Sequence, residues 1–337
     1  MPPILFFNAD QELKTYADTH SIPDTEFVFF EESFNAIPDT TLKKFKDTEI
    51  ISVFVHSEQI EMQKLDLFPN LKLIATRSTG FNHIDLNYCK NRGIHVVNVP
   101  RYGEATVAEF AFGLLLALSR KIIIANTAMT HGHVDIDAYI GMDLMGKTLG
   151  IIGTGSIGRH MIQIAQGFGM NIVAYDLFPS PDLEEIYTPT LDQLYARSDI
   201  ISLHVPSTRE NFHMLNETAF SKMKRGVLLI NTARGDLIDT QALYHALRQG
   251  IVGGAGLDVL ENEDFLLHDD LSVPQKMTDQ SFLLDSALNL KLLQFKNVIA
   301  TPHIAFNSSD AVHRILKTTF DNIHAFLNGT LQNSVIK

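Results

Sequence analysis

The chain has 337 residues, more than one hydrophobic core usually supports, so two domains or one domain with a large insertion are expected. Its composition, 45% hydrophobic and 20% charged, is that of an ordinary globular protein. The formal net charge of -12 and the lack of any long Lys/Arg run argue against nucleic acid as a partner, because binding a phosphate backbone needs a basic surface.

Cysteine content and apolar runs indicate the cellular compartment of the protein. A single cysteine, Cys89, leaves no disulfide framework and no thiolate metal site within the chain, and a reducing compartment fits best. No basic leader precedes Asp10, and the longest apolar tract, 110–117, is too short to cross a bilayer. No third ligand stands beside the pair His131 and His133, so no metal is expected. We therefore expect a cytoplasmic protein that engages neither membranes nor metals.

The first third of the chain alternates short β-rich apolar runs with helix-forming stretches. This alternation is typical of βαβ units, in which helices cover both faces of a parallel sheet. Strands are predicted at 4–7, 27–30, 50–54, 73–76 and 95–98. From 104 to about 129 the pattern changes to one long apolar helix, which could bridge domains or subunits or be buried within one chain.

A second series of strands begins after Gly146, most of them followed by helix-forming sequence. Six strands are predicted, at 147–152, 171–175, 200–205, 227–231, 254–259 and 298–300, enough for a complete dinucleotide-binding domain. Residues 264–293 show no clean period and are interpreted as an insertion. A closing helix is predicted over 308–327, ending before Gly329, and it is expected to fold back onto the first domain. The fold class is therefore α/β, with two doubly wound parallel-sheet domains.

A glycine motif marks the second series as a cofactor domain. Gly153-Thr-Gly155-Ser156-Ile157-Gly158 follows a predicted strand and opens a helical pattern, which is the context that the dinucleotide fingerprint requires. Its glycines allow a tight turn, close approach of the backbone to a pyrophosphate and packing of helix on strand. We predict that all residues of this motif except the threonine bind the diphosphate at the N-terminus of the helix.

Asp176 strengthens this interpretation. It ends the next predicted strand, eighteen positions past Gly158, close to the spacing of the acid that binds the ribose hydroxyls. A carboxylate there repels a 2′-phosphate, and its neighbours Leu177 and Phe178 supply no compensating cation. NAD is therefore predicted as the cofactor rather than NADP.

Three further motifs stand at the carboxyl ends of predicted strands, where open α/β sheets place their ligands. They are Asn231-Thr-Ala-Arg234-Gly235, the segment 256–263 with Asp258 and Glu263, and Thr301-Pro-His303-Ile-Ala-Phe306. In these motifs and their order the sequence resembles the D-isomer-specific 2-hydroxyacid dehydrogenase family over nearly its whole length. The resemblance implies a flavodoxin-like substrate domain of 1–101 and 305–337, and a Rossmann NAD-binding domain of 102–304.

The resemblance also implies a catalytic set of Arg234, Glu263 and His303. Arg234 grips the substrate, since a planar guanidinium can bind a carboxylate and polarise a carbonyl. His303 is the proton donor, a role that suits an imidazole near neutral pH. Glu263 orients the imidazole and stabilises its charged form.

Further site residues follow from the same resemblance. The loop Ser78-Thr79-Gly80 binds the substrate carboxylate through backbone N–H groups, although a plain turn is the alternative. Tyr102 and Phe306 border a small side-chain pocket, or else pack in the core. Near the cofactor the resemblance places Val205, Pro206, Asn211, Thr232, Ala233, Arg234 and Asp258, the last of these against the nicotinamide.

The resemblance implies reduction of a small 2-oxo acid to its D-2-hydroxy acid, with pyruvate and NADH preferred. Glu263 is followed by Asp264 and a long insertion, as in fermentative D-lactate dehydrogenases. Glyoxylate, hydroxypyruvate and branched-chain 2-oxo acids remain alternative substrates, and an NADH-sensing binding protein of the same fold is the alternative from another class. The family implies a homodimer.

Overall fold

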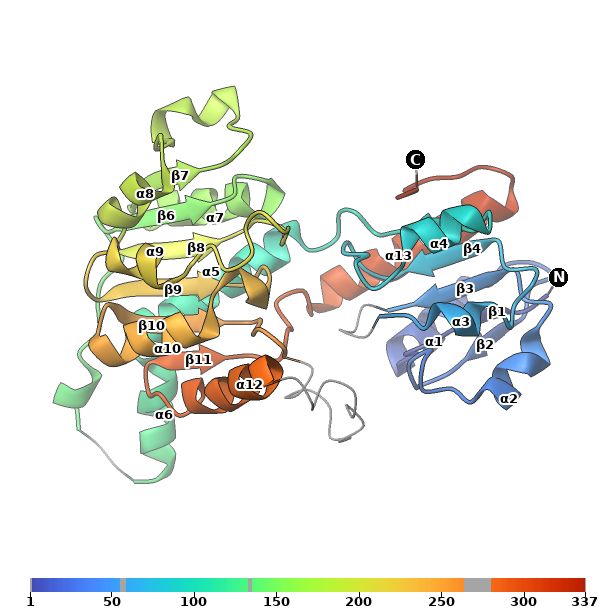
Figure 1. The fold of residues 1–337 in the computed structure, drawn as a ribbon, viewed down its shortest axis with the longest axis horizontal. Helices are drawn as coiled ribbons and strands as arrows, with labels where there is room; N and C mark the ends of the chain where they lie inside the picture. The colour runs from blue at the N-terminus through green and yellow to red at the C-terminus, as the bar shows by residue number, and fades with distance from the viewer. Residues whose placement is uncertain (1, 55–58, 133–134, 264–279, 337) are drawn as a thin grey trace. The chain divides into compact units, whose positions relative to one another are not determined.

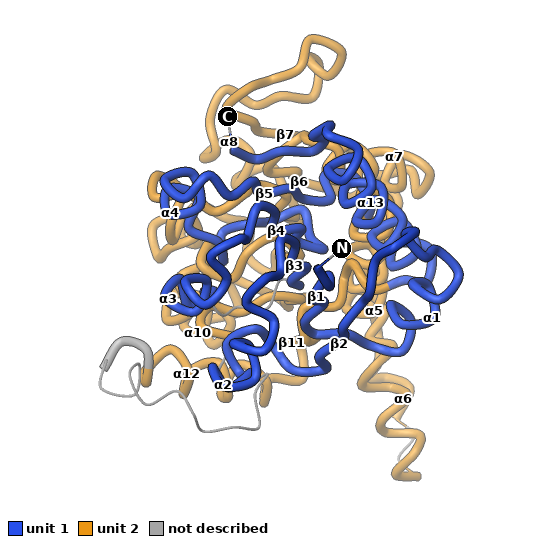
Figure 2. The backbone as a smooth tube through the Cα atoms, turned by 90° about the vertical axis from the view of Figure 1, so that its right-hand side faces the viewer, with its two compact units in different colours: residues 1–102, 308–337 blue, residues 103–307 orange. Residues whose placement is uncertain are grey.

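The computed structural model describes the chain except for residues 1, 55–58, 133–134, 264–279 and 337 (Figure 1). The chain divides into two compact units, one of residues 1–102 and 308–337 and the other of residues 103–307 (Figure 2). Each unit is built on one sheet whose strands all pair in parallel. The predicted α/β class with two parallel-sheet domains is therefore confirmed.

The first unit holds a five-stranded sheet in the order β2-β1-β3-β4-β5. Its strands are β1 Ile4–Phe6, β2 Phe27–Phe29, β3 Ile50–Val53, β4 Leu73–Thr76 and β5 His95–Val97. Its helices are α1 Gln11–Thr19, α2 Asp39–Leu42, α3 Met62–Leu65, α4 Leu86–Asn91 and α13 Ser309–Leu327, with the 3-10 turn η1 Lys43–Phe45. All five strands lie where the sequence predicts them.

Both faces of this sheet are covered. On one face Phe6 and Leu73 pack against α1 and α13, and Phe320 of α13 stacks on Phe6 with ring centroids 5.7 Å apart. On the other face Ile51 and Ile74 pack against the shorter helices α2 to α4. The closing helix of the chain thus returns to the first unit, as predicted.

The second unit holds a six-stranded sheet in the order β11-β10-β9-β8-β6-β7. Its strands are β6 Thr148–Ile152, β7 Asn171–Tyr175, β8 Ile200–Leu203, β9 Val227–Asn231, β10 Val252–Leu257 and β11 Val298–Ala300. Helices α5 Glu104–Ser119 and α7 Ser156–Gly167 cover one face (Figure 1). The other face packs on α8 Leu191–Arg197, α9 Glu217–Ser221, α10 Thr240–Gln249 and α12 Gln280–Leu292. The unit also contains α6 Ile122–Thr130 and the 3-10 turns η2 Asp137–Tyr139, η3 Pro181–Ile186 and η4 Gly235–Leu237.

One prediction about this unit was wrong. The long helix expected from 104 to 129 is divided into α5 and α6, because Lys121 adopts a left-handed conformation (φ 55°) that an α-helix does not contain. Within 264–293, interpreted as an insertion without a clean period, the structure shows a helix that no local pattern indicates, α12, whose Ser286, Asn289 and Leu292 are buried. Residues 264–279 lie outside the described part of the chain.

Among the helices of the described residues, none is both long enough and apolar enough to cross a bilayer.

Candidate active site

The glycine loop lies at the point where the sheet order reverses, because β6 is flanked by β7 on one side and β8 on the other. Gly153 has a φ of 96°, and a Cβ there would lie 2.5 Å from the carbonyl oxygen of His204. A Cβ on Gly158 would lie 2.0 Å from the Gly153 carbonyl oxygen, whereas one on Gly155 would meet nothing within 4 Å. Gly153 and Gly158 therefore pack closely within the turn. Gly155 leaves open space next to Ser156, the first residue of α7.

This geometry predicts a large difference between two glycine substitutions in α7. Gly158→Ala is expected to lower the free energy of unfolding by about 2 kcal/mol and to weaken NADH binding, because the new methyl group displaces the Gly153 peptide. Gly167→Ala, in the same helix with nothing within 4 Å, is expected to stabilise the protein by about 0.5 kcal/mol. Thermal melts and NADH fluorescence titrations of both variants check this, and equal effects would contradict it.

Asp176 follows β7 and faces the glycine loop. Its Oδ2 accepts hydrogen bonds from the backbone N–H of Thr154 at 2.7 Å and from the Thr154 hydroxyl at 3.0 Å. Its Oδ1 accepts from the N–H of Phe178 at 2.9 Å. The Thr154 hydroxyl also lies 2.6 Å from the Tyr187 hydroxyl. The carboxylate is therefore oriented beside the glycine turn, where an acid that binds ribose is expected.

The segment after β8 also borders the glycine loop. Val205 packs on the turn, since a Cβ on Gly153 would lie 2.7 Å from its Cγ1. The Asn211 side chain donates to the Pro206 carbonyl at 2.7 Å and accepts from the Thr208 N–H at 2.7 Å, which closes this loop on itself.

His204, in the same segment, provides a test of pH dependence. Burial lowers the pKa of His204 to about 4, and its Nε2 lies 2.8 Å from the hydroxyl of the fully buried Ser202. Because the folded-state pKa lies below the unfolded value of about 6.5, the folded protein disfavours the proton. The neutral imidazole therefore favours folding fully above pH 6.5. As pH falls towards 4, protonation of the unfolded chain lowers the free energy of unfolding by up to about 3 kcal/mol. Melting temperatures between these pH values are expected to fall less steeply in His204→Gln than in the wild type.

Glu263 and His303 form a direct hydrogen bond. His303 Nδ1 lies 2.7 Å from Glu263 Oε1, and the other oxygen, Oε2, accepts from the Leu260 N–H at 3.0 Å. The glutamate side chain is 18% exposed and the histidine side chain 36%. Glu263 therefore fixes the orientation of the ring and leaves Nε2 as the nitrogen that can exchange a proton with a bound molecule.

Asp258 holds the turn that carries His303. Its Oδ1 accepts from the Thr301 hydroxyl at 2.6 Å and from the Ile304 N–H at 2.9 Å, and its Oδ2 accepts from the Ala305 N–H at 2.8 Å. Burial raises the pKa of Asp258, and the hydrogen bonds from Thr301, Ala305 and Ile304 act in the opposite direction. His303 has a φ of 53°, a conformation that few non-glycine residues adopt without such support.

Arg234 follows β9 on the neighbouring strand end. Strand β10 pairs with β9 through Leu257 and Asn231 and with β11 through Leu257 and Ala300, so the three predicted catalytic residues follow three adjacent strands. The guanidinium donates to the Ala233 carbonyl at 2.6 Å. Among the described residues it makes no hydrogen bond with the Glu263–His303 pair.

Thr232, one of the predicted cofactor residues, has a buried hydroxyl with no hydrogen-bond partner in the part of the chain that the structure describes. An unsatisfied buried hydroxyl is costly, so it suits a position that faces a polar ligand. Together with the open space beside Gly155, this hydroxyl makes the residues present compatible with a bound dinucleotide.

The predicted carboxylate loop lies in the first unit, directly after β4. The Ser78 hydroxyl donates to the Gly80 carbonyl at 2.6 Å, and the Thr79 hydroxyl donates to the Val99 carbonyl at 2.8 Å. The Asn98 side chain donates to the Thr79 carbonyl at 2.8 Å. Side chains thus donate to the carbonyls of Thr79 and Gly80, and no described residue accepts a hydrogen bond from the N–H of either residue.

The sequence interpretation missed Arg77, which precedes this loop. Its guanidinium is buried and donates to the carbonyls of Phe7 and Asn8 and to the Ser52 hydroxyl. Burial lowers the pKa of Arg77 to about 10, against the attraction of Asp10. The side chain is therefore still charged at neutral pH, beside a loop expected to bind an anion.

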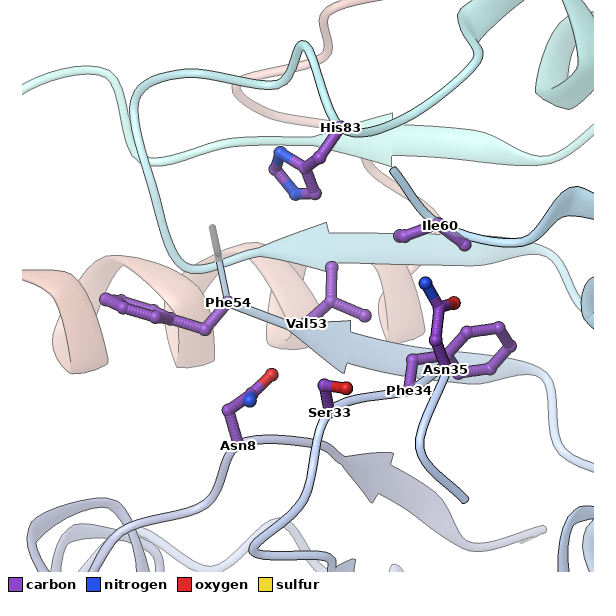
Figure 3. Close-up of a pocket in the computed structure, with 8 residues that line it drawn as sticks. All are labelled: Asn8, Ser33, Phe34, Asn35, Val53, Phe54, Ile60 and His83. Carbon is purple, nitrogen blue, oxygen red and sulfur yellow. The ribbon is translucent and has the colours of Figure 1, made fainter. Parts of the chain in front are cut away.

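A recess opens at the carboxyl edge of the same sheet. Figure 3 shows Asn8 after β1, Phe54 after β3 and His83 in the loop after β4 around it. Of the two predicted aromatic residues, Tyr102 is half-buried in the first unit and accepts a hydrogen bond from Arg314 Nε at its carbonyl, at 2.7 Å. Phe306 is half-buried in the second unit.

The doubly wound sheet, the glycine turn and the acid after β7 define the second unit as a dinucleotide-binding domain of an oxidoreductase. A family model described as the NAD binding domain of D-isomer specific 2-hydroxyacid dehydrogenase matches residues 112–305. The chain belongs to the D-isomer-specific 2-hydroxyacid dehydrogenase family, as the sequence motifs predict, and NAD is its cofactor.

Relatives of known name are similar over most of the chain. The D-lactate dehydrogenase of Escherichia coli is 38% identical over 304 residues, which cover 89% of this chain and 90% of that protein. An aromatic 2-oxoacid reductase of Clostridium sporogenes is 40% identical over 266 residues, 78% of each chain. The structure of D-lactate dehydrogenase from Aquifex aeolicus, complexed with NAD and lactic acid, superimposes with a TM-score of 0.85 at 38% identity and covers 99% of both chains.

Proposed function

We propose that the protein reduces pyruvate to D-lactate with NADH. The observation that carries this proposal is the 2.7 Å hydrogen bond between Glu263 and His303, which prepares an imidazole to give a proton to a substrate oxygen. The similarity to D-lactate dehydrogenases over nine-tenths of the chain supports pyruvate as the substrate.

The chemistry requires a hydride at the carbonyl carbon and a proton at the oxygen. Bound NADH supplies the hydride. His303 donates the proton from Nε2, and Glu263 stabilises the protonated ring before the transfer. Arg234 binds the substrate carboxylate and polarises the carbonyl. Among the described residues its guanidinium donates only to Ala233, which leaves other N–H groups for this role.

The remaining assignments concern binding. The N–H groups of Ser78, Thr79 and Gly80 hold the carboxylate, with the charge of Arg77 beside them. Tyr102 and Phe306 border the substrate side chain. The cofactor is bound by Gly153, Gly155, Ser156, Ile157, Gly158, Asp176, Val205, Pro206, Asn211, Thr232, Ala233, Arg234 and Asp258. The substrate domain comprises residues 1–101 and 305–337, and the NAD-binding domain comprises 102–304.

A larger 2-oxo acid is the second candidate substrate, because a relative 40% identical is an aromatic 2-oxoacid reductase. Steady-state NADH oxidation with pyruvate, glyoxylate, hydroxypyruvate, a branched-chain 2-oxo acid and phenylpyruvate separates these possibilities. The highest kcat/KM with pyruvate, and a D-configured product, are expected. A preference for phenylpyruvate would reassign the substrate, and NADH binding without turnover of any acid would favour a sensing protein.

We also propose that the protein is a cytoplasmic homodimer. The region of α6 and the segment after it exposes large apolar side chains, among them Ile122, Met129, Ile136 and Ile140, with exposed fractions between 51% and 80%. Such a surface is unusual on a monomer and suits a self-complementary interface. Analytical ultracentrifugation gives the mass in solution, and a monomer at micromolar concentration would contradict the proposal.

A further inference from the structure

A second contact between a carboxylate and an imidazole lies two residues from Glu263. Glu261 Oε1 is 2.6 Å from His213 Nε2, and Glu261 Oε2 accepts a hydrogen bond from the Thr240 hydroxyl at 3.0 Å. The glutamate side chain is 9% exposed and the histidine side chain 28%. Both carboxylate oxygens are therefore occupied by protein groups, so Glu261 does not offer an oxygen to a substrate.

The backbone of Glu261 is held as firmly as its side chain. Its carbonyl accepts a hydrogen bond from the side chain of Asn289, a buried residue of α12, at 2.7 Å. A Cβ on Gly235 would lie 2.2 Å from the Leu260 carbonyl carbon and 2.4 Å from the Glu261 nitrogen. The residue that follows Arg234 thus packs directly on the peptide that leads into Glu261.

His213 connects this point to a further loop. Its backbone N–H donates to the carbonyl of Asp236 at 2.9 Å, and the Ser207 hydroxyl donates to the Asp236 side chain at 2.6 Å. The loop after β8 is therefore attached to the segment after Arg234 by its backbone and to Glu261 by the imidazole. Glu261 lies where the loops after β8, β9 and β10 meet.

The next residue reverses the direction of the chain. Asn262 has a φ of 55°, in the left-handed region, so Glu261 and Glu263 project to different partners although only one residue separates them. Glu261 turns to His213 and Thr240, and Glu263 turns to His303. Loss of the Glu261 contacts would free the turn that places the Glu263 carboxylate.

We propose that Glu261, held by His213 and Thr240, is a positioning residue that fixes Glu263 against His303. This inference rests on the proposed role of Glu263. It predicts that Glu261 affects turnover only through Glu263, and it assigns His213 to the support of the turn rather than to proton transfer.

A double-mutant cycle tests the proposal. Glu261→Ala is expected to lower kcat about 10-fold, because small displacements of catalytic groups are costly, and Glu263→Gln about 100-fold. The double variant is expected to match Glu263→Gln within about twofold, since the first change has nothing left to misplace. Glu261→Gln is expected to restore most of kcat, because its amide oxygen can accept from Thr240 and its NH₂ group can donate to the His213 ring. The NADH dissociation constant should stay within about twofold throughout.

Asp192→Ala is the matched control, because it removes a carboxylate from another ion pair of the same unit, with Lys222 at 2.7 Å on the surface. If Glu261→Ala does not fold, His213→Ala breaks the same contact from its more exposed side and replaces it in the cycle. Wild-type kcat in the single variant, or a double variant slowed by the product of the two effects, would overturn the inference. Wild-type kcat in Glu263→Gln would instead refute the role of Glu263 itself.

Discussion

Replacement of His303 by asparagine is expected to lower kcat for 2-oxo acid reduction about 1000-fold and to leave the NADH dissociation constant within about twofold. The asparagine amide can donate hydrogen bonds but cannot act as an acid near neutral pH, and the reaction requires an acid. It also tolerates the left-handed backbone at this position, where φ is 53°, so the turn is expected to survive the change. Single-turnover kinetics and NADH fluorescence titration measure the two quantities separately.

His245→Asn is the matched control, since His245 is an exposed residue of α10 in the same unit. It should leave both kcat and NADH binding unchanged. A His303→Asn enzyme with wild-type kcat would show that another group supplies the proton. A variant that lost NADH binding as well would show that His303 supports the cofactor domain rather than the chemical step.

The fold could be predicted from the sequence because its strands are buried on both faces. Strands such as β4 and β9 are short, continuous apolar runs bounded by polar segments, and this pattern is local. The break at Lys121 could not be predicted, because a lysine in a left-handed conformation has no local signal. Helix α12 was also missed, since its apolar residues do not follow a clear helical period and tertiary packing decides which of them are buried.

The site residues likewise divide into those that local spacing predicts and those that only the fold brings together. The glycine loop and Asp176 could be predicted because their spacing along the chain corresponds to one strand, one helix and the next strand. The pairing of Glu263 with His303 rested on a family resemblance, since forty positions separate them. Glu261 and His213 lie forty-eight positions apart, and no motif connects them; only the folded chain brings them together. The buried charge of Arg77 was missed for the same reason, because its partners come from the residue after β1 and from β3.

The second large effect is expected at Asp258. Asp258→Asn should lower the free energy of unfolding by about 2 kcal/mol, because one oxygen that accepts a hydrogen bond becomes an NH₂ group. If the amide oxygen keeps the contacts with Thr301 and Ile304, the NH₂ group faces the Ala305 N–H, 2.8 Å from the present oxygen, and two donors then oppose each other. A thermal melt and a urea titration measure this loss.

The same change is expected to lower kcat about 100-fold, because His303 is held in a left-handed conformation by the turn that Asp258 closes. Thr301→Val removes only one of the three donors and serves as the graded control, with an expected loss of about 1 kcal/mol in the free energy of unfolding.

The Asp258→Asn variant also decides between two roles for Asp258. If the carboxylate mainly holds the turn, kcat and the free energy of unfolding fall together while NADH affinity is unchanged. If it mainly contacts the nicotinamide, the NADH dissociation constant rises while the melting temperature stays near the wild-type value. Since all three hydrogen bonds to the carboxylate come from residues 301–305, the first outcome is expected, in which the proposed contact of Asp258 with the cofactor adds little to NADH affinity.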